Sequence, residues 1–216
     1  MCGRYASSRS PEDLVSYFEV EEPPEEVLAP SWNVAPTDKV YAVLQRDTRQ
    51  LRVLRWGLVP SWSKGAKGAA RMINARQESV PTKPAFRKAY ATRRCLVPAD
   101  GYFEWKPEGV GKQPFYLSTQ DPLAMAGLYE HWKTPEGEWL STCTIITTSA
   151  PDDLGEIHDR SPLLVPSDAW GVWLDPTVPD PGDLLIPGTL GVLEAWPVGK
   201  RVGNVHNNGP ELVLPI

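Results

Sequence analysis

The sequence has few cysteines and histidines, three of each among 216 residues. Cys2, Cys95 and Cys143 are too scattered for a disulfide framework or a CxxC zinc site, so we expect reduced thiols and no metal or other cofactor. No apolar run approaches the roughly 18 residues of a membrane-spanning helix, and no apolar segment follows a basic one at the N-terminus. These absences favour a cytoplasmic protein with no membrane partner.

Long helices are also expected to be absent, because 23 residues are proline, about twice the usual share of about 5%. Short helices are predicted from the Ser10-Pro11 cap through Phe18, at Pro84–Arg94 and at Ser167–Leu174. Strands are predicted at Val40–Arg46, Leu51–Trp56, Cys95–Val97, Gly101–Lys106, Pro114–Ser118, Leu123–Trp132, Leu140–Thr148 and Val192–Val198. We expect one monomeric α+β domain over residues 1–216, with a largely antiparallel, barrel-like β core and short peripheral helices.

Charge is distributed unevenly along the chain. The formal net charge is −5, yet residues 51–112 contain 13 Lys and Arg against 4 Asp and Glu, and the remainder contains 9 against 23. A basic middle in an acidic chain favours a localised site for a polyanion. Composition alone is equally compatible with charges scattered over a solvated surface.

Cys2 directly follows the initiator methionine, and a residue this small normally permits removal of that methionine. The mature chain would then begin with a 1,2-aminothiol, whose amine has a reference pKa of about 7.7–8.0 and whose thiol has one of about 8.5. Such a pair suits attack on an aldehyde, because the amine forms an imine and the sulfur closes a thiazolidine ring. Alternatively, Cys2 is only a small buried apolar residue.

Several short segments occur in a specific order along the chain. They are Met1-Cys2-Gly3-Arg4-Tyr5, Asn33-Val34-Ala35-Pro36-Thr37, Arg55-Trp56-Gly57-Leu58-Val59-Pro60-Ser61-Trp62, Asn74-Ala75-Arg76-Gln77-Glu78, Pro98-Ala99-Asp100-Gly101-Tyr102-Phe103-Glu104-Trp105 and Ile157-His158-Asp159-Arg160-Ser161-Pro162. Each is weak alone, but the ordered set resembles the SRAP (SOS response-associated peptidase) family over essentially the whole chain. One departure is Ser161, where methionine is expected, and it bears on the packing beside His158.

Members of this family shield abasic sites in single-stranded DNA by crosslinking to them through an N-terminal cysteine. The resemblance therefore implies that single-stranded DNA with abasic sites is the partner, and that the protein is associated with the nucleoid when bound. Carried over by motif, the catalytic residues would be Cys2, Asn74, Glu104 and His158.

These residue types fit imine chemistry. Glu104 would move protons between the amine and the departing hydroxyl, provided that burial among Tyr102, Phe103 and Trp105 raises its pKa, since an ionised carboxylate would hold the amine protonated. Asn74 would orient the sugar or the amine, although it could merely cap a turn.

His158 would transfer a proton at the sugar ring oxygen or the 3′ leaving group. Of the other two histidines, His131 lies in an aromatic strand and is expected in the core, and His206 lies in a polar loop.

The DNA surface is predicted from cations and one aromatic side chain. Arg4, Arg76 and Arg160 each lie within two residues of a proposed catalytic residue, as phosphate contacts would. Trp62, in a basic loop containing glycine, would stack on a base. Weaker candidates are Lys64, Lys67, Arg71, Arg87 and Lys88. Other tryptophans, such as Trp139, Trp170 and Trp173, are expected in the core.

Two other classes of function remain open. A thiol autopeptidase or N-terminal-nucleophile hydrolase would also expose Cys2, and a non-catalytic reader of modified DNA bases would leave Cys2 inert. The chain contains neither Gly-x-Ser-x-Gly nor a Gly-Lys-Ser/Thr phosphate loop, so serine hydrolase and P-loop activities have no support.

Overall fold

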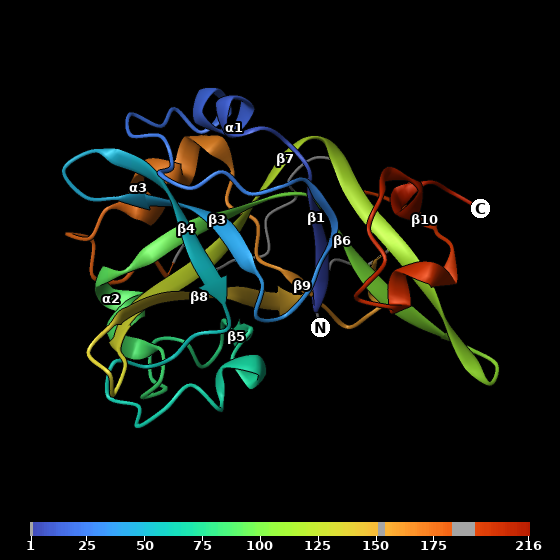
Figure 1. The fold of residues 1–216 in the computed structure, drawn as a ribbon. Coiled ribbons are helices and arrows are strands. Elements are labelled where there is room, and N and C mark those ends of the chain that lie inside the picture. Colours follow the sequence, from blue (N-terminus) through green and yellow to red (C-terminus); the bar gives the residue numbers. More distant parts are fainter. Residues whose placement is uncertain (1, 151–153, 183–192) are drawn as a thin grey trace.

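The computed structural model describes residues 2–150, 154–182 and 193–216, which form a mixed α+β domain that is mostly sheet (Figure 1). The strands are β1 Arg4–Ser7, β2 Ser31–Val34, β3 Lys39–Gln45, β4 Arg49–Trp56, β5 Asn74–Arg76, β6 Arg94–Glu108, β7 Gly111–Lys133, β8 Trp139–Ser149, β9 Arg160–Pro162 and β10 Glu194–Pro197. The helices are α1 Pro11–Tyr17, α2 Arg87–Thr92 and α3 Trp170–Leu174.

The central strands form a ring-like sheet. β6 pairs with β7, β7 with β8, β8 with β4, β4 with β3, and β3 with β6, so the path of hydrogen-bonded neighbours closes on itself. The parallel joint between β4 and β8 spans two residue pairs, Arg55↔Thr142 and Trp56↔Cys143, whereas the other ring pairings are antiparallel. The predicted α+β class with a largely antiparallel, barrel-like core is confirmed.

Side chains of one strand alternate between two apolar clusters, as the period of a strand requires. In β3, Tyr41 and Val43 pack in the cluster that includes Phe18 of the α1 end and Trp173 of α3. Their neighbours Ala42 and Leu44 pack in the other cluster, which contains all three cysteines. The helices therefore cover one face of the sheet, and Cys2 lies in the other apolar cluster.

The predicted helices are present with some changes in length. The Ser10 hydroxyl accepts a hydrogen bond from the Asp13 amide at 3.1 Å, so α1 begins at its predicted cap. Ser167–Leu174 forms a 3-10 turn followed by α3. The helix predicted at Pro84–Arg94 is shorter, because α2 spans only Arg87–Thr92.

Four predicted strands merge into two long ones. β6 continues through Pro98, which pairs with Ala124, and β7 continues through Pro122, which lies within a register shift. Ala99 faces Leu123 and Gly101 faces Ser118, so extra β7 residues bulge opposite Asp100. A Cβ at Gly101 would lie 2.5 Å from the Tyr116 ring, which explains the glycine at this crossing.

Other sequence predictions have mixed outcomes. Trp170 and Trp173 are buried as predicted, but Trp139 is 69% exposed, so its assignment to the core is wrong. His131 is only partly buried, and His206 is exposed as predicted. The predicted strand Val192–Val198 appears as β10, with Val192 lying outside the described residues. No helix in the described ranges is long and apolar enough to cross a membrane.

Candidate functional site

Cys2 lies just before β1 and is completely buried. Its thiol contacts the carbonyl oxygen of Arg4 at 3.9 Å, a weak hydrogen bond. Burial, reinforced by the nearby negative charge of Glu104, raises the pKa of the Cys2 thiol far above its ordinary value. The thiol is therefore protonated at neutral pH.

Asn74 connects the start of the chain to β5. This three-residue strand runs parallel to β8, with Asn74 facing Ile145. The Asn74 side-chain nitrogen donates to the carbonyl oxygen of Cys2 at 2.8 Å, and Figure 1 shows the start of β1 beside β5. The Asn74 side-chain oxygen is buried and receives no hydrogen bond from the described residues. The amide thus holds the Cys2 backbone through its nitrogen and leaves its oxygen as an acceptor.

Glu104 lies on β6, the neighbour of β1. β1 and β6 are antiparallel and Arg4 faces Phe103, so the residues that precede Arg4 lie alongside Glu104. The Glu104 side chain is buried between the sheet and the segment before β9, and this burial raises its pKa to about 7. This raised pKa is the condition that the proton-transfer role requires, because near neutrality the carboxyl group then exchanges readily between its protonated and ionised forms.

His158 follows a short turn and precedes β9. Its Nδ1 accepts the backbone N–H of Arg160 at 3.0 Å and also lies 2.9 Å from a carboxylate oxygen of Asp159. These two contacts require opposite protonation of Nδ1. The amide is fixed by the backbone, whereas the Asp159 side chain is 86% exposed and easily rotates away. Burial lowers the pKa of His158, so the neutral ring with its proton on Nε2 prevails.

Glu104 and His158 line one small cavity, together with Tyr102, Leu117 and Ile157. Ser161 also contributes to this cavity from β9, where it faces Thr148 of β8. The small Ser161 side chain is 5% exposed and packs beside the histidine where a methionine was expected. The structure therefore brings Cys2, Asn74, Glu104 and His158, which come from four separate segments, into one region.

A groove of about 790 Å³ begins at Asn74. We call it the basic groove; it is lined by Arg71, Met72, Asn74, Arg76, Glu78, Ser79, Lys83, Ala85, Phe86, Thr147 and Arg160. A second hollow shares Ala85 with it and is lined by Ser61, Trp62, Pro81, Pro84, Arg87, Lys88 and Glu130. Trp62 is 67% exposed there, as stacking on a base would require. We refer to these two hollows, which share Ala85 in their lining, together as the path between Asn74 and Trp62.

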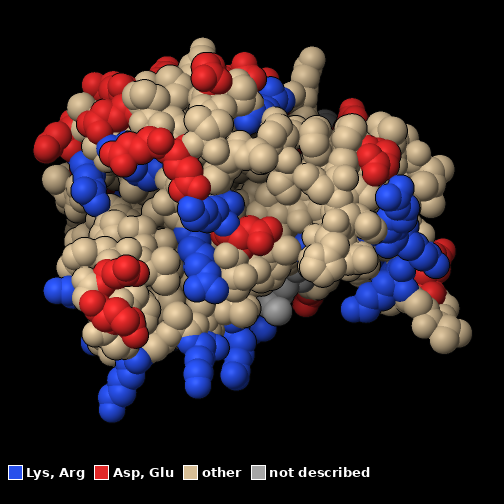
Figure 2. All heavy atoms as spheres, viewed as in Figure 1, with Lys and Arg blue, Asp and Glu red and all other residues tan. Residues whose placement is uncertain are grey.

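Cations surround this path. In Figure 2, Lys and Arg side chains project from the lower edge, where Figure 1 places the chain between β4 and α2. Arg71, Arg76 and Lys83 are exposed in the basic groove. Sequence reasoning missed Lys83, although it lies in the predicted basic middle. Lys64 and Lys67 are exposed on the same loop as Trp62 but do not line either hollow.

Two of the predicted phosphate contacts already have protein partners. The Arg4 guanidinium donates to Asn33 at 2.7 Å and to the Val202 carbonyl at 2.9 Å, so it ties β1 to the C-terminal region. Arg160 lies in the basic groove but forms an ion pair with Glu78. Arg4 and Arg160 remain predicted phosphate contacts, each with an intramolecular partner in the free protein.

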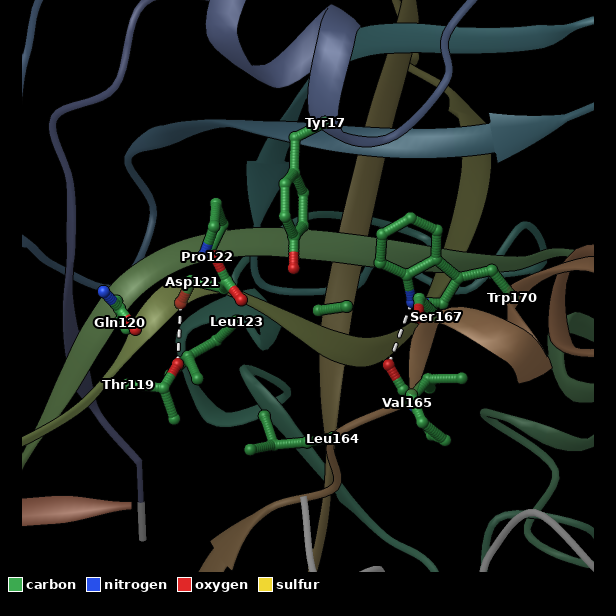
Figure 3. A pocket seen from close by; sticks show the side chains of 12 residues that line it. Tyr17, Thr119, Gln120, Asp121, Pro122, Leu123, Leu164, Val165, Ser167 and Trp170 are labelled. Carbon is green, nitrogen blue, oxygen red and sulfur yellow. Dashed lines mark hydrogen bonds between the residues drawn. The ribbon is translucent and has the colours of Figure 1, made fainter. Parts of the chain in front are cut away.

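Another hollow of about 370 Å³ lies elsewhere, between α1, the bend of β7 and α3 (Figure 3). Tyr17 points into it beside Pro122 and Trp170. It contains one carboxylate, Asp121, and no Lys, Arg, His or Cys. It therefore pairs no acid with a basic side chain. In the described part of the chain, no group of three His, Cys, Asp or Glu side chains could hold a metal ion.

Comparison with known proteins agrees with the motif order. A family model described as SOS response associated peptidase (SRAP) matches residues 1–205. "Abasic site processing protein YoqW" of Bacillus subtilis (strain 168) is 39% identical over 221 residues, covering 99% of both chains. "Abasic site processing protein YedK" of Escherichia coli (strain K12) is 34% identical over 229 residues, covering 100% of both. A crystal structure of a protein from Bacteroides thetaiotaomicron aligns over 100% of both chains, with TM-score 0.89 and 25% identity. The chain belongs to the SRAP family.

Proposed function

We propose that this protein processes abasic sites in single-stranded DNA by capturing them covalently on Cys2 after removal of Met1. The proposal is supported by two side chains that converge on Cys2. The Asn74 amide nitrogen lies 2.8 Å from the Cys2 carbonyl oxygen, and the nearby Glu104 carboxyl group has a pKa of about 7. The names of the relatives, abasic site processing proteins, support the same substrate.

The amine reacts before the sulfur. Because burial holds the Cys2 thiol protonated, the free α-amine is the stronger nucleophile toward the C1′ aldehyde of the open sugar. The amine nitrogen bonds to C1′, and the resulting carbinolamine loses water to give an imine. The sulfur then adds to C1′ while the thiol proton passes to the nitrogen, which closes the thiazolidine ring with loss of one water overall.

Glu104 and His158 divide the proton transfers. The Glu104 carboxylate takes a proton from the attacking amine, and its protonated form donates to the departing hydroxyl, which a pKa of about 7 allows at neutral pH. The Asn74 oxygen orients the amine. Ring opening breaks the C1′–O4′ bond and moves the proton of the C1′ hydroxyl to O4′. The Nε2–H of neutral His158 promotes this step by a hydrogen bond that stabilises the negative charge developing on O4′, while the Arg160 amide keeps Nδ1 occupied.

The basic groove supplies the binding energy. Exposed cations on one side of Asn74 contact successive phosphates, and Trp62 stacks on a base farther along the path. The sugar must leave the base stack to reach Cys2, so single strands bind better than intact duplex. With about three to five phosphates neutralised, log affinity falls with log salt at a slope of roughly −2 to −4.

The test is incubation of protein lacking Met1 with a single-stranded oligonucleotide that carries one abasic site. We expect an adduct that survives denaturation without borohydride, with a mass equal to the sum of both molecules minus one water. Cys2→Ser should give only a labile imine, and retained Met1 should give neither product. A stable adduct formed by Cys2→Ala would refute the mechanism, and binding without any adduct would favour the non-catalytic reader.

A further inference from the structure

Glu78 is the one acidic residue among residues 61–94, a segment that contains nine Lys and Arg. It lines the basic groove, where its carboxylate accepts two hydrogen bonds from the same guanidinium. Arg160 Nη1 lies 2.5 Å from Glu78 Oε1, and Arg160 Nη2 lies 3.2 Å from Oε2. This two-point contact is the arrangement with which arginine also recognises a phosphate.

The two partners differ in their attachment to the protein. Arg160 Nη2 also donates to the carbonyl oxygen of Thr147 at 2.5 Å, and its side chain is only 14% exposed. The Glu78 side chain is 51% exposed. The Arg160 side chain is thus held by its hydrogen bond to β8. The more exposed Glu78 side chain is the partner that is more easily displaced.

The position of this ion pair matters for the site. The backbone amide of Arg160 donates to His158, so this guanidinium is attached next to a residue of the reactive region. Arg71, Arg76 and Lys83 line the same groove, and none of them forms a direct ion pair in the described ranges, although the Arg76 charge helps to lower the pKa of Glu78. Of the basic residues that line the groove, Arg160 is therefore the one held in a direct ion pair with a carboxylate in the free protein.

We propose that Glu78 occupies, on Arg160, the place of the DNA phosphate beside the lesion, and that this phosphate displaces it on binding. The inference rests on the DNA binding of the proposed function. When the phosphate leaves water, each of its contacting oxygens takes the place of one Glu78 carboxylate oxygen on Arg160. The guanidinium is therefore paired both before and after DNA binds. Strands that do not place a phosphate at this point leave the ion pair closed and gain no contact from Arg160.

The experiment measures the affinity of a single-stranded oligonucleotide that carries a tetrahydrofuran abasic analogue, which has no aldehyde and cannot crosslink, by fluorescence anisotropy over a series of salt concentrations. The variants are Glu78→Gln, which keeps the shape and removes the charge, and Glu78→Asp, which keeps the charge but is too short for the two-point contact. Glu25→Gln is the matched control, because it removes an equally exposed charge far along the chain from the groove.

Glu78→Gln is expected to bind about three- to tenfold more tightly, with a salt slope steeper by about 1. Glu78→Asp is expected to bind more tightly than the unaltered protein, and Glu25→Gln to bind equally. Weaker binding by Glu78→Gln would show that Glu78 positions Arg160 for DNA. Tighter binding by Glu78→Gln with no gain for Glu78→Asp would show simple charge repulsion. Either result overturns the proposal.

A measurement on the unaltered sequence covers the case in which a variant misfolds. With 13C-labelled glutamate, the Glu78 carboxylate signal should move when the oligonucleotide is added, whereas the Glu25 signal should not. An unmoved Glu78 signal in saturated protein contradicts displacement. Crosslinking of an abasic oligonucleotide is assayed separately. If no crosslink forms, the proposed function is wrong. If the crosslink forms but Glu78→Gln gains no affinity, only the role proposed for Glu78 is wrong.

Discussion

Two segments of this molecule have opposite charges of nearly equal size. Residues 10–38 contain eight Asp and Glu and no Lys or Arg, whereas residues 61–94 contain nine Lys and Arg and one Glu. In Figure 2, the acidic side chains crowd the upper left and basic ones the lower edge. From composition alone, either segment could bind a partner of opposite charge.

The structure pairs three of the eight acidic residues of the first segment with a neighbouring hairpin. Glu19, Glu22 and Glu26 form ion pairs with Arg49, Arg52 and Lys39 of the β3–β4 hairpin, at 3.2, 2.6 and 2.7 Å.

In the basic segment, seven exposed cations have no acidic partner in the described ranges, namely Lys64, Lys67, Arg71, Arg76, Lys83, Arg87 and Lys88. Arg93 pairs with Glu130, and the buried Arg94 donates to carbonyls of Tyr90 and Trp173. Pairing, rather than net charge, decides which surface is available to a polyanion.

The largest expected effect separates chemistry from binding. Glu104→Gln should slow crosslinking of an abasic oligonucleotide by about 10²-fold or more, because it removes the group that exchanges protons with the amine. Affinity for an undamaged strand should stay nearly constant, because Glu104 lies outside the basic groove. Single-turnover gel assays and anisotropy measure the two quantities. A parallel loss of both would place Glu104 in the binding surface.

The same substitution should stabilise the fold above neutral pH. The pKa of Glu104 is raised to about 7 in the folded protein, so the unfolded chain ionises first and stability falls as pH rises from about 4.5 through 7. Glu104→Gln lacks this loss and should be more stable by roughly 2–3 kcal/mol at pH 8, or roughly 5–10 °C in Tm, with little difference at pH 4. Thermal unfolding at both pH values measures it; a gain independent of pH would contradict the buried ionised carboxylate.

A matched pair of arginine variants tests the comparison directly. Arg76→Gln removes an unpaired cation from the groove and should weaken single-strand binding about three- to tenfold, with a salt slope shallower by about 1. Arg52→Gln removes a cation that is paired with Glu22 and should leave the affinity unchanged. Equal losses in the two variants would mean that net charge alone governs binding.

Local patterns predicted the elements that are held by local contacts. The β3–β4 hairpin and the cap of α1 were readable because alternation and a Ser-Pro cap specify them within a few residues. The short strands β1, β2, β5 and β9 were not predicted, because three or four residues carry no period and their pairing depends on distant partners. β6 and β7 appeared interrupted because proline and glycine normally end strands, and a bulge accommodates them here.

The candidate site was predictable in part. The family resemblance identified Cys2, Asn74, Glu104 and His158, and apolar neighbours indicated that burial would raise the Glu104 pKa. The pairing of arginines was not predictable, because a sequence gives the charge of a side chain but not its partner. Arg4 meets a carbonyl 198 residues away at Val202, and Arg160 meets Glu78 82 residues away.

The burial of Cys2 also has a consequence for redox chemistry. Oxidation by peroxide and alkylation by small electrophiles both require an accessible thiolate, and this sulfur is enclosed and protonated. We expect it to withstand oxidants that attack exposed thiols. In the proposed mechanism Cys2 reacts only once per molecule, and this burial would preserve it for its substrate under the oxidising conditions that damage DNA.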